Sequence, residues 1–271
     1  MRRTSALVLF AVGIALYCLA PFLWFVLTSL KSNAELTAIP PTLMPSMHLT
    51  FYRSALEQYG LLRYVLNSVI VAGSATLVTI AIASLAAYAI ARFKLKWTNF
   101  YLFLLLAISM FPQIAIAGPV WRILDRLELL NTYPGLAAAY IALSLPLAVW
   151  ILTTFFREVP GEIEEAALID GCSRIQVLYK VVLPLAAPGI LTAALLVFIQ
   201  AWNEFFFALI IMTDPTVQTL PVGIALFPGE YTMPWGEIAA ASTMATIPLI
   251  VLTLIFQRGI VRGLSAGAVK G

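Results

Sequence analysis

Long apolar stretches are the feature that most limits what this chain can fold into. A helix needs roughly 20 apolar residues to cross about 30 Å of hydrocarbon. The stretches that meet or approach this length are residues 6–30, 65–91, 100–120, 135–156, 185–212 and 238–256. They lack the apolar–polar alternation of strands in an outer-membrane barrel, so they predict helices. We therefore expect an all-α membrane protein, with six transmembrane helices in a single domain over residues 1–271.

Composition excludes the main alternatives to a membrane protein. Of the 271 residues, 62% are hydrophobic and 11% are charged, whereas soluble domains are about 45–50% apolar and about 25% charged. A soluble globule could not bury this excess in one core, and a disordered chain requires low hydrophobicity. One histidine and two cysteines exclude a His/Cys metal cluster or a disulfide framework built within the chain, so no metal ligand is predicted.

The first apolar stretch has features of a secretory signal, because Arg2 and Arg3 precede it. However, residues 6–30 exceed the roughly 7–15 apolar residues of such a signal, and no small-x-small cleavage site follows. Tyr17 precedes Cys18, and its bulk does not suit cleavage at a lipid-modified cysteine. We expect an uncleaved first helix.

The basic residues predict the orientation of the helices in the membrane. Eleven of the sixteen Lys and Arg residues fall on the side of Arg2 and Arg3, and five fall on the other side. Because cytoplasmic loops carry the excess of positive charge, both termini are predicted in the cytoplasm, with the chain in the cytoplasmic membrane and in contact with its lipid. No basic patch lies beside stacking aromatic residues, so nucleic acid is not an expected partner.

The predicted inner loop, residues 157–184, contains its own helix signals. Pro160 marks a helix start, Gly171 permits a left-handed stop, and Ser173 with Gln176 forms a possible capping box. Three acidic residues crowd the first turn, where they favour the positive end of the helix dipole: Glu162, Glu164 and Glu165. We predict a short helix, a bend and a second helix at the membrane face.

Two interpretations of this loop remain open on local physics. Ala166 and Ala167 have small side chains that let another protein approach closely, and Asp170 stands at the unfavourable C-terminal end of the first helix unless a partner supplies a cation. Alternatively, the loop is an amphipathic connector that packs on its own bundle. The second helix carries an apolar stripe at helical spacing: Ile175, Leu178, Tyr179 and Val182.

The same loop resembles that of a known family. Glu165-Ala166-Ala167 is followed after three residues by Gly171, and after nine more by Val181-x-Leu183-Pro184. This pattern resembles the EAA loop of ABC importer permeases, which usually carries Ile at the position of Val181. Three further segments look like carbohydrate importers of the maltose-permease type: Ala201-Trp202-Asn203-Glu204-Phe205, Leu220-Pro221-Val222-Gly223 and Gly267-Ala268-Val269-Lys270-Gly271.

The resemblance implies the type I ABC importer permease fold and a set of partners. These are a second, homologous permease, a dimer of cytoplasmic ABC ATPase subunits that bind ATP and Mg, and an extracytoplasmic sugar-binding protein. It also implies that the EAA helix is a coupling helix seated on an ATPase. The residues that this carries over to the ATPase contact are Glu165, Ala166, Ala167, Asp170 and Gly171. Leu183 and Pro184 would mark the return into the membrane.

The C-terminal tail has a possible role by the same resemblance. In the maltose-type relative the tail of one permease reaches the ATPase dimer interface, which implies a similar contact here for Gly267, Ala268, Val269, Lys270 and Gly271. The alternative is a solvated tail. The chain has no Gly-x-x-x-x-Gly-Lys-Ser/Thr phosphate loop, so it is not expected to bind ATP by that route, and no cofactor or catalytic residue is predicted.

A few polar residues within the apolar stretches are candidates for the path of the solute. A charge inside a span costs about 2.5–3.5 kcal/mol, and Glu204 is the one carboxylate placed well inside a predicted span. Asn203 and Trp202 adjoin it, while Asn67 and Gln113 lie in the second and third stretches. Either some of these residues contact a sugar or gate its path, or Glu204 anchors neighbouring helices and the aromatic residues face lipid.

Three other functions compete with that of a sugar-importer permease. A secondary transporter requires inverted repeats and ion ligands inside the membrane. The sequence has no evident repeat and a single carboxylate within the predicted spans, so it offers little of either. An intramembrane enzyme requires a Ser/His pair or an Asp dyad, neither of which the stretches contain. An ABC permease for another small solute, such as glycerol phosphate or a polyamine, remains the alternative. The sequence identifies neither the sugar nor which permease of the pair contacts it.

Overall fold

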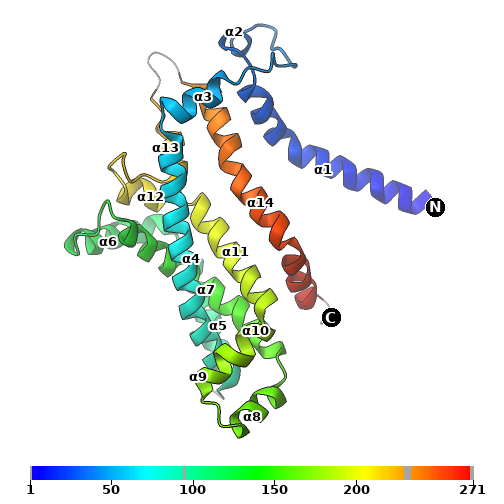
Figure 1. Cartoon of the computed structure of the whole chain (residues 1–271), viewed down its shortest axis with the longest axis vertical. Helices are drawn as coiled ribbons and strands as arrows, with labels where there is room; N and C mark the ends of the chain where they lie inside the picture. The colour runs from blue at the N-terminus through cyan, green and yellow to red at the C-terminus, as the bar shows by residue number, and fades with distance from the viewer. Residues whose placement is uncertain (1, 94–95, 229–232, 269–271) are drawn as a thin grey trace. The chain divides into compact units, whose positions relative to one another are not determined.

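The computed structural model describes residues 2–93, 96–228 and 233–268 (Figure 1), and within these ranges the regular structure is all helical. The elements are α1 (Arg2–Ser29), α2 (Asn33–Leu36), α3 (Thr50–Glu57), α4 (Leu61–Arg92), α5 (Thr98–Ser109), α6 (Gln113–Arg126), α7 (Tyr133–Glu158), α8 (Gly161–Ile169), α9 (Arg174–Val177), the π-helical turn η1 (Leu178–Val182), α10 (Leu183–Leu185), α11 (Ala187–Asn203), α12 (Phe206–Ile211), α13 (Leu220–Ala225) and α14 (Trp235–Ala268). The all-α fold predicted from the sequence is confirmed.

Four helices are long and apolar enough to cross a membrane unaided. They are Leu7–Ser29 of α1, Leu61–Arg92 (α4), Tyr133–Glu158 (α7) and Trp235–Phe256 of α14. Two further pairs of helices pass the same test together but are sharply bent: Phe100–Ser109 with Gln113–Arg126, at 87°, and Arg174–Leu185 with Ala187–Asn203, at 83°. Counting each bent pair as one crossing raises the number among the described residues to six.

The predicted third stretch, residues 100–120, is divided between two helices. α5 ends at Ser109 and α6 begins at Gln113, with Pro112 as its N-cap. Proline has no N–H to continue the helix, and its ring clashes with the carbonyl four residues earlier, which favours a break at Pro112. α6 and α7 nevertheless continue through Pro119 and Pro146, so a proline alone does not decide where a helix ends. The sequence marks this interruption, but it does not give the 87° turn that follows.

The predicted fifth stretch, residues 185–212, is also broken. α11 spans Ala187–Asn203, and a second break separates it from α12. At the entry, Pro184 and Pro188 both lack the N–H that an uninterrupted helix would use. The π-helical turn η1 ends just before Pro184, where Leu183 N–H bonds to Leu178 O, and the chain bends at Ala186.

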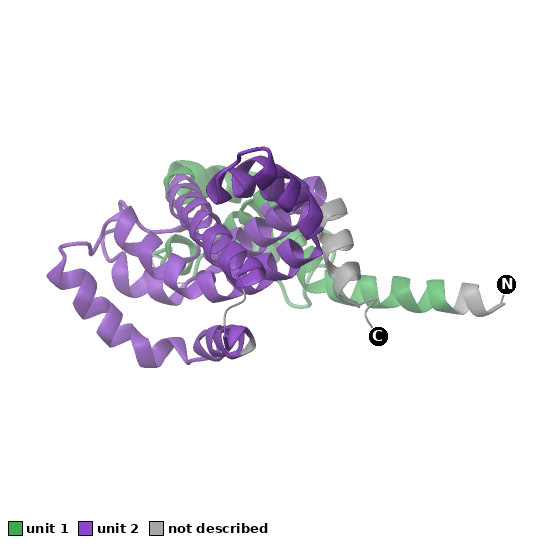
Figure 2. Cartoon of the chain, turned by 90° about the horizontal axis from the view of Figure 1, so that it is seen from below, with its two compact units in different colours: residues 1–65, 222–248 green, residues 66–221, 249–271 purple. Residues whose placement is uncertain are grey.

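Residue contacts divide the chain into two compact units (Figure 2). Unit 1 comprises residues 1–65 and 222–248, and unit 2 comprises residues 66–221 and 249–271.

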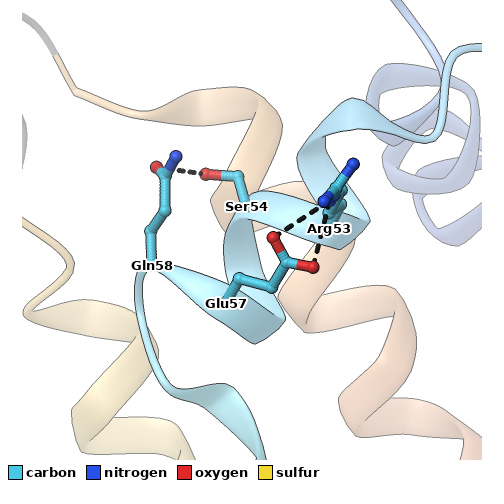
Figure 3. Close-up of polar contacts among 4 residues, drawn as sticks. All are labelled: Arg53, Ser54, Glu57 and Gln58. Atoms are coloured by element: carbon cyan, nitrogen blue, oxygen red, sulfur yellow. Dashed lines mark hydrogen bonds and ion pairs between the residues drawn. The ribbon is translucent and has the colours of Figure 1, made fainter.

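In unit 1, α3 is held by local bonds and by one buried ring. Phe51 is only 3% exposed. Ser54 Oγ donates to Gln58 Oε1 at 2.9 Å, and Arg53 pairs with Glu57 at 2.9 Å (Figure 3). The Arg53–Glu57 pair is largely exposed, so it contributes only about 0.3–0.5 kcal/mol. Burial of the α3 face, rather than this ion pair, therefore stabilises the helix.

The loop after α1 is organised by one carboxylate, Glu35. It accepts bonds from Ser46 Oγ and from Ser32 N–H, both at 2.7 Å. These two bonds lower its pKa to about 2 from an ordinary 4.5. Because the pKa is lowered in the folded state, the stabilisation is complete above pH 4.5 and disappears as the pH falls through about 2.

Small residues allow the helices of unit 2 to pack closely. Ala83 and Ala87 of α4 are fully buried in a cluster with Leu152 and Phe156 of α7 and Val182 of η1. Helices in lipid associate mainly through such close packing, because the lipid chains offer no hydrophobic drive between helices. The cluster ties α4, α7 and the loop 157–184 into one body.

Gly189 of α11 lies directly against α7, because a Cβ at that position would overlap the ring of Phe155. We predict that Gly189→Ala destabilises the protein by about 1–3 kcal/mol, the usual cost of overpacking. The measurement is the thermal unfolding midpoint of the purified protein in detergent. Gly73→Ala is the matched control, since nothing lies within 4 Å of its Cβ position. Equal midpoints for the two variants would contradict the assignment.

Candidate functional site

The loop 157–184 folds as its helix signals indicate, at the lower end of α4, α5 and α7 in Figure 1. α8 begins directly after Pro160 and ends at a left-handed Gly171, whose φ is +86°. Gly171 N–H bonds to Leu168 O at 3.1 Å, and Cys172 N–H bonds to Ala167 O at 3.0 Å. This pair of bonds is the Schellman arrangement that closes a helix. The predicted start and stop of α8 are confirmed.

The second helix begins with the predicted capping box. Ser173 N–H donates to Gln176 Oε1 at 2.7 Å, and Ser173 Oγ accepts from Gln176 N–H at 3.4 Å. The predicted apolar stripe is only half correct. Leu178 and Val182 are buried, whereas Ile175 and Tyr179 are 69% and 49% exposed. After only four α-helical residues the chain enters the wider π-helical turn η1, which changes the residues that share a face.

The residues predicted to contact a partner lie mostly at the surface. Those on or next to α8 are exposed except for Ala167, which is half-buried: Glu165, Ala166, Asp170 and Gly171. Pro184 is exposed and Leu183 is half-buried. Sequence reasoning missed Ile169, which is 86% exposed on the same short helix. A large apolar side chain displayed among charged neighbours is typical of a surface that another protein covers.

The opposite side of α8 is held by a buried ion pair that sequence reasoning did not find. The carboxylate of Glu164 pairs with Arg92 at the end of α4, and Tyr88 Oη donates to Glu164 Oε2 at 3.2 Å. Arg92 Nη2 also donates to Val159 O at 2.8 Å. Removing one partner of such a pair leaves a buried charge, at a cost of about 3–5 kcal/mol. The available signal was the spacing of Tyr88 and Arg92, which are four apart and share a helix face.

Glu204 lies outside the helices, contrary to its predicted position within a continuous span. It follows α11 with extended backbone, and its two carboxylate oxygens accept from Phe207 N–H at 2.9 Å and Ala208 N–H at 3.1 Å. Tyr140 Oη donates to its carbonyl at 3.4 Å. Breaking a helix in the membrane frees N–H groups that need internal acceptors. In this structure the Glu204 carboxylate supplies them for α12.

The other candidates for the solute path are also engaged locally. Trp202 is 2% exposed and stacks on Phe198, with ring centroids 5.6 Å apart. Asn203 is exposed, and its Nδ2 donates to Ile199 O at 2.8 Å. Gln113 is exposed at the first turn of α6. The structure therefore does not gather the predicted path residues into one polar cluster.

Asn67 has a structural role in this conformation, because its buried side chain bonds to other segments. It is 2% exposed, and its Nδ2 donates to Thr216 O at 3.1 Å and Gln218 O at 2.8 Å, while its Oδ1 accepts from Tyr133 Oη at 2.7 Å. The next residue, Ser68, accepts from Leu220 N–H at 2.8 Å. The start of α4 in unit 2 therefore holds the segment between α12 and α13.

Two further features bear on the predicted sites. Gly267 and Ala268 form the end of α14, while Val269, Lys270 and Gly271 lie outside the described residues.

A cavity of about 190 Å³ opens between α6 and α7 beside Phe207. Its lining includes Ile116 and Leu143 and is almost wholly apolar. Such a cavity has no groups to bond the hydroxyls of a sugar, so it does not suit a sugar site.

Comparison with known proteins identifies the class of this chain. The profile of the family described as binding-protein-dependent transport system inner membrane component matches residues 79–266. The trehalose/maltose transport system permease protein MalG of Thermococcus litoralis is 43% identical, over 98% of this chain and 96% of that protein. The sulfoquinovosyl glycerol transport system permease protein SmoH of Agrobacterium fabrum is 44% identical, over 93% of this chain and 89% of that protein.

A third relative supports this class, and one solved structure has the same fold. The trehalose transport system permease protein SugB of Mycobacterium tuberculosis is 40% identical, over 94% of this chain and 93% of that protein. A crystal structure of a bacterial ABC transporter involved in import of the acidic polysaccharide alginate contains a chain with a TM-score of 0.80 and 23% identity, covering 95% of this chain and 96% of that one. The chain belongs to the binding-protein-dependent transport system inner membrane components, as the EAA resemblance implied.

If Glu204 caps α12, replacing it must change stability. We predict that Glu204→Ala destabilises the protein by about 0.5–2 kcal/mol, the usual cost of losing a helix cap. Glu204→Gln should lose less, because its amide oxygen still accepts one bond. The measurement is the thermal unfolding midpoint in detergent, with uptake measured in parallel. A wild-type midpoint in Glu204→Ala together with lost uptake would instead favour direct contact with the solute.

Proposed function

We propose that this chain is the membrane-spanning permease subunit of an ATP-driven sugar importer. It pairs with a second, homologous permease, rests on a dimer of cytoplasmic ABC ATPase subunits and receives its solute from an extracytoplasmic sugar-binding protein. The observation that carries the proposal is α8, a short helix with the EAA pattern whose Glu165–Ala166 side is exposed while Glu164 is buried. Such a helix is anchored in the permease and offers its other side to a partner.

A carbohydrate is the solute that the relatives support. Their names specify trehalose or maltose, sulfoquinovosyl glycerol and trehalose, and each is at least 40% identical over more than nine-tenths of this chain. The class is therefore a mono-, di- or oligosaccharide. These names differ among themselves, so the class is proposed here rather than one sugar.

Energy reaches the solute path by a shift between two conformations. ATP and Mg are bound by the ATPase subunits, and closure of their dimer moves the groove in which α8 sits. α8 follows as a rigid body, because the Glu164–Arg92 pair and the packing of Ala167 and Leu168 against the buried cluster attach it to the permease. The ATPase biases the permease only by its different affinity for the two states. No chemical step is assigned to this chain.

The distribution of basic residues in the sequence supports one orientation of the chain in the membrane. The loop 157–184 lies on the cytoplasmic side, as the excess of basic residues predicts, and both termini lie on that side as well. By the family resemblance, the C-terminal residues Gly267–Gly271 are proposed as a second contact with the ATPase subunits.

We predict that a cysteine at Ala166 cross-links to the ATPase subunit in native membranes, because this side chain is exposed on α8. The measurement is a cross-linking assay with a maleimide–benzophenone reagent, which requires a thiol only at residue 166, after Cys18 and Cys172 are replaced by alanine. Thr37→Cys, exposed in the loop after α2, is the matched control. It should not cross-link to the ATPase, and a membrane-impermeant thiol reagent should label it from the outer face.

Two results would overturn the proposal. One is labelling of Ala166→Cys by an impermeant reagent from the outer face. The other is a cross-linked product at Ala166→Cys that contains no ATPase subunit although the complex remains assembled. Recovery of the assembled complex is checked by purification through a tag on the ATPase.

A further inference from the structure

We propose that Arg92 and Tyr88 are positioning residues for energy coupling. Through the buried carboxylate of Glu164 they fix α8 to the end of α4, so that the ATPase-facing helix and this long helix move as one element. The inference rests on the function proposed above and adds to it the side chains that transmit the motion inside the permease.

The burial of Glu164 is selective and needs a specific cause. The first part of α8 holds three glutamates, and the positive end of the helix dipole would suit any of them at the surface. Glu162 and Glu165 are exposed, whereas Glu164 is 5% exposed. Its side chain meets Arg92 and Tyr88 from α4, 72 and 76 residues away in the chain. The contact is therefore a tertiary interaction that fixes α8 to α4, and not a local helix cap.

Arg92 joins three segments at once. Its Nε pairs with Glu164 of α8, and its Nη2 donates to the carbonyl of Val159, the residue that ends α7. Only a guanidinium offers two such donors in a fixed plane, so a lysine cannot reproduce both bonds. The ends of α4 and α7 and the start of α8 thus share one side chain.

Directional bonds are needed because the rest of the contact is apolar. Ala167 and Leu168 of α8 pack against the buried cluster of Ala83, Ala87 and Phe156. Apolar packing is not directional, so it can allow α8 to slide when it is pushed. The ion pair and the Tyr88 hydroxyl fix its register along α4.

α4 also reaches the segment between α12 and α13. It has 32 residues, which is about 48 Å at 1.5 Å per residue. Near its start in unit 2, Asn67 and Ser68 bond to Thr216, Gln218 and Leu220. A displacement of α8 therefore moves α4 and, through α4, the segment between α12 and α13. The Arg92–Glu164 pair is the contact through which α8 first moves α4.

The test measures uptake per ATP hydrolysed in proteoliposomes that contain the whole importer, with the sugar-loaded binding protein present. Arg92→Lys and Glu164→Gln are expected to lower this ratio about tenfold or more, because each weakens a hydrogen bond to a charged group. Tyr88→Phe removes one oxygen and is expected to give a smaller loss of about threefold. Glu158→Gln and Arg157→Lys, both exposed at the end of α7 and outside α8, are matched controls and should keep the wild-type ratio.

The uptake-to-ATP ratio and the cross-link together distinguish a loss of coupling from a loss of assembly, and a failure of this inference from a failure of the proposed function. Each variant also carries Ala166→Cys, and cross-linking to the ATPase should persist while the ratio falls. A wild-type ratio in Arg92→Lys and Tyr88→Phe overturns the inference. Failure of the cross-link in the otherwise wild-type chain overturns the proposed function instead. If Arg92→Lys does not assemble, Tyr88→Phe decides, because it keeps both charges.

Discussion

A carboxylate buried at the end of a membrane bundle persists only with a cation and further donors around it. The rest of the loop 157–184 depends on this constraint. Glu164 has Arg92 and Tyr88 as its partners, and their positions set which side of α8 turns inward. Pro160 and the left-handed Gly171 then limit the helix to nine residues. The outcome is a short, rigid helix whose Glu165–Ala166 side stays at the surface, which is the form that a mechanical contact with an ATPase requires.

The same constraint accounts for the polar groups next to the helix breaks. Backbone N–H groups freed inside a membrane need internal acceptors, and Glu204 supplies two oxygens where α11 gives way to α12. Asn67 bonds backbone carbonyls of an irregular segment in a similar way. In this structure, these side chains therefore bond to backbone N–H and C=O groups that the helix breaks leave without helical partners. A conformation open to the solute would have to replace some of these hydrogen bonds with others. The shape of the solute path therefore depends on the bonding at the helix breaks.

The sequence predicts the parts of the fold that depend on local pattern. Apolar length locates the four long spans in α1, α4, α7 and α14 within a few residues, although α14 itself continues to Ala268. The Ser173–Gln176 capping box also appears as expected. The sharp turn after α5 was not predictable, since Pro112 shows where a helix stops but not the angle of its successor. Nor could pattern distinguish Glu164 from Glu162 and Glu165, because the three share type and dipole environment. Only the fold brings Arg92, 72 residues away, to one of them.

The central claim is that α8 and α4 move as one element. It is tested most directly by the distance between spin labels at Ala166 on α8 and at Leu77, which is 74% exposed on α4, measured by double electron–electron resonance in the assembled importer. The distance is predicted to be the same in the nucleotide-free and ATP-trapped states, between which the proposed function requires the ATPase dimer to close. A change comparable to one helical turn, about 5 Å, would contradict it.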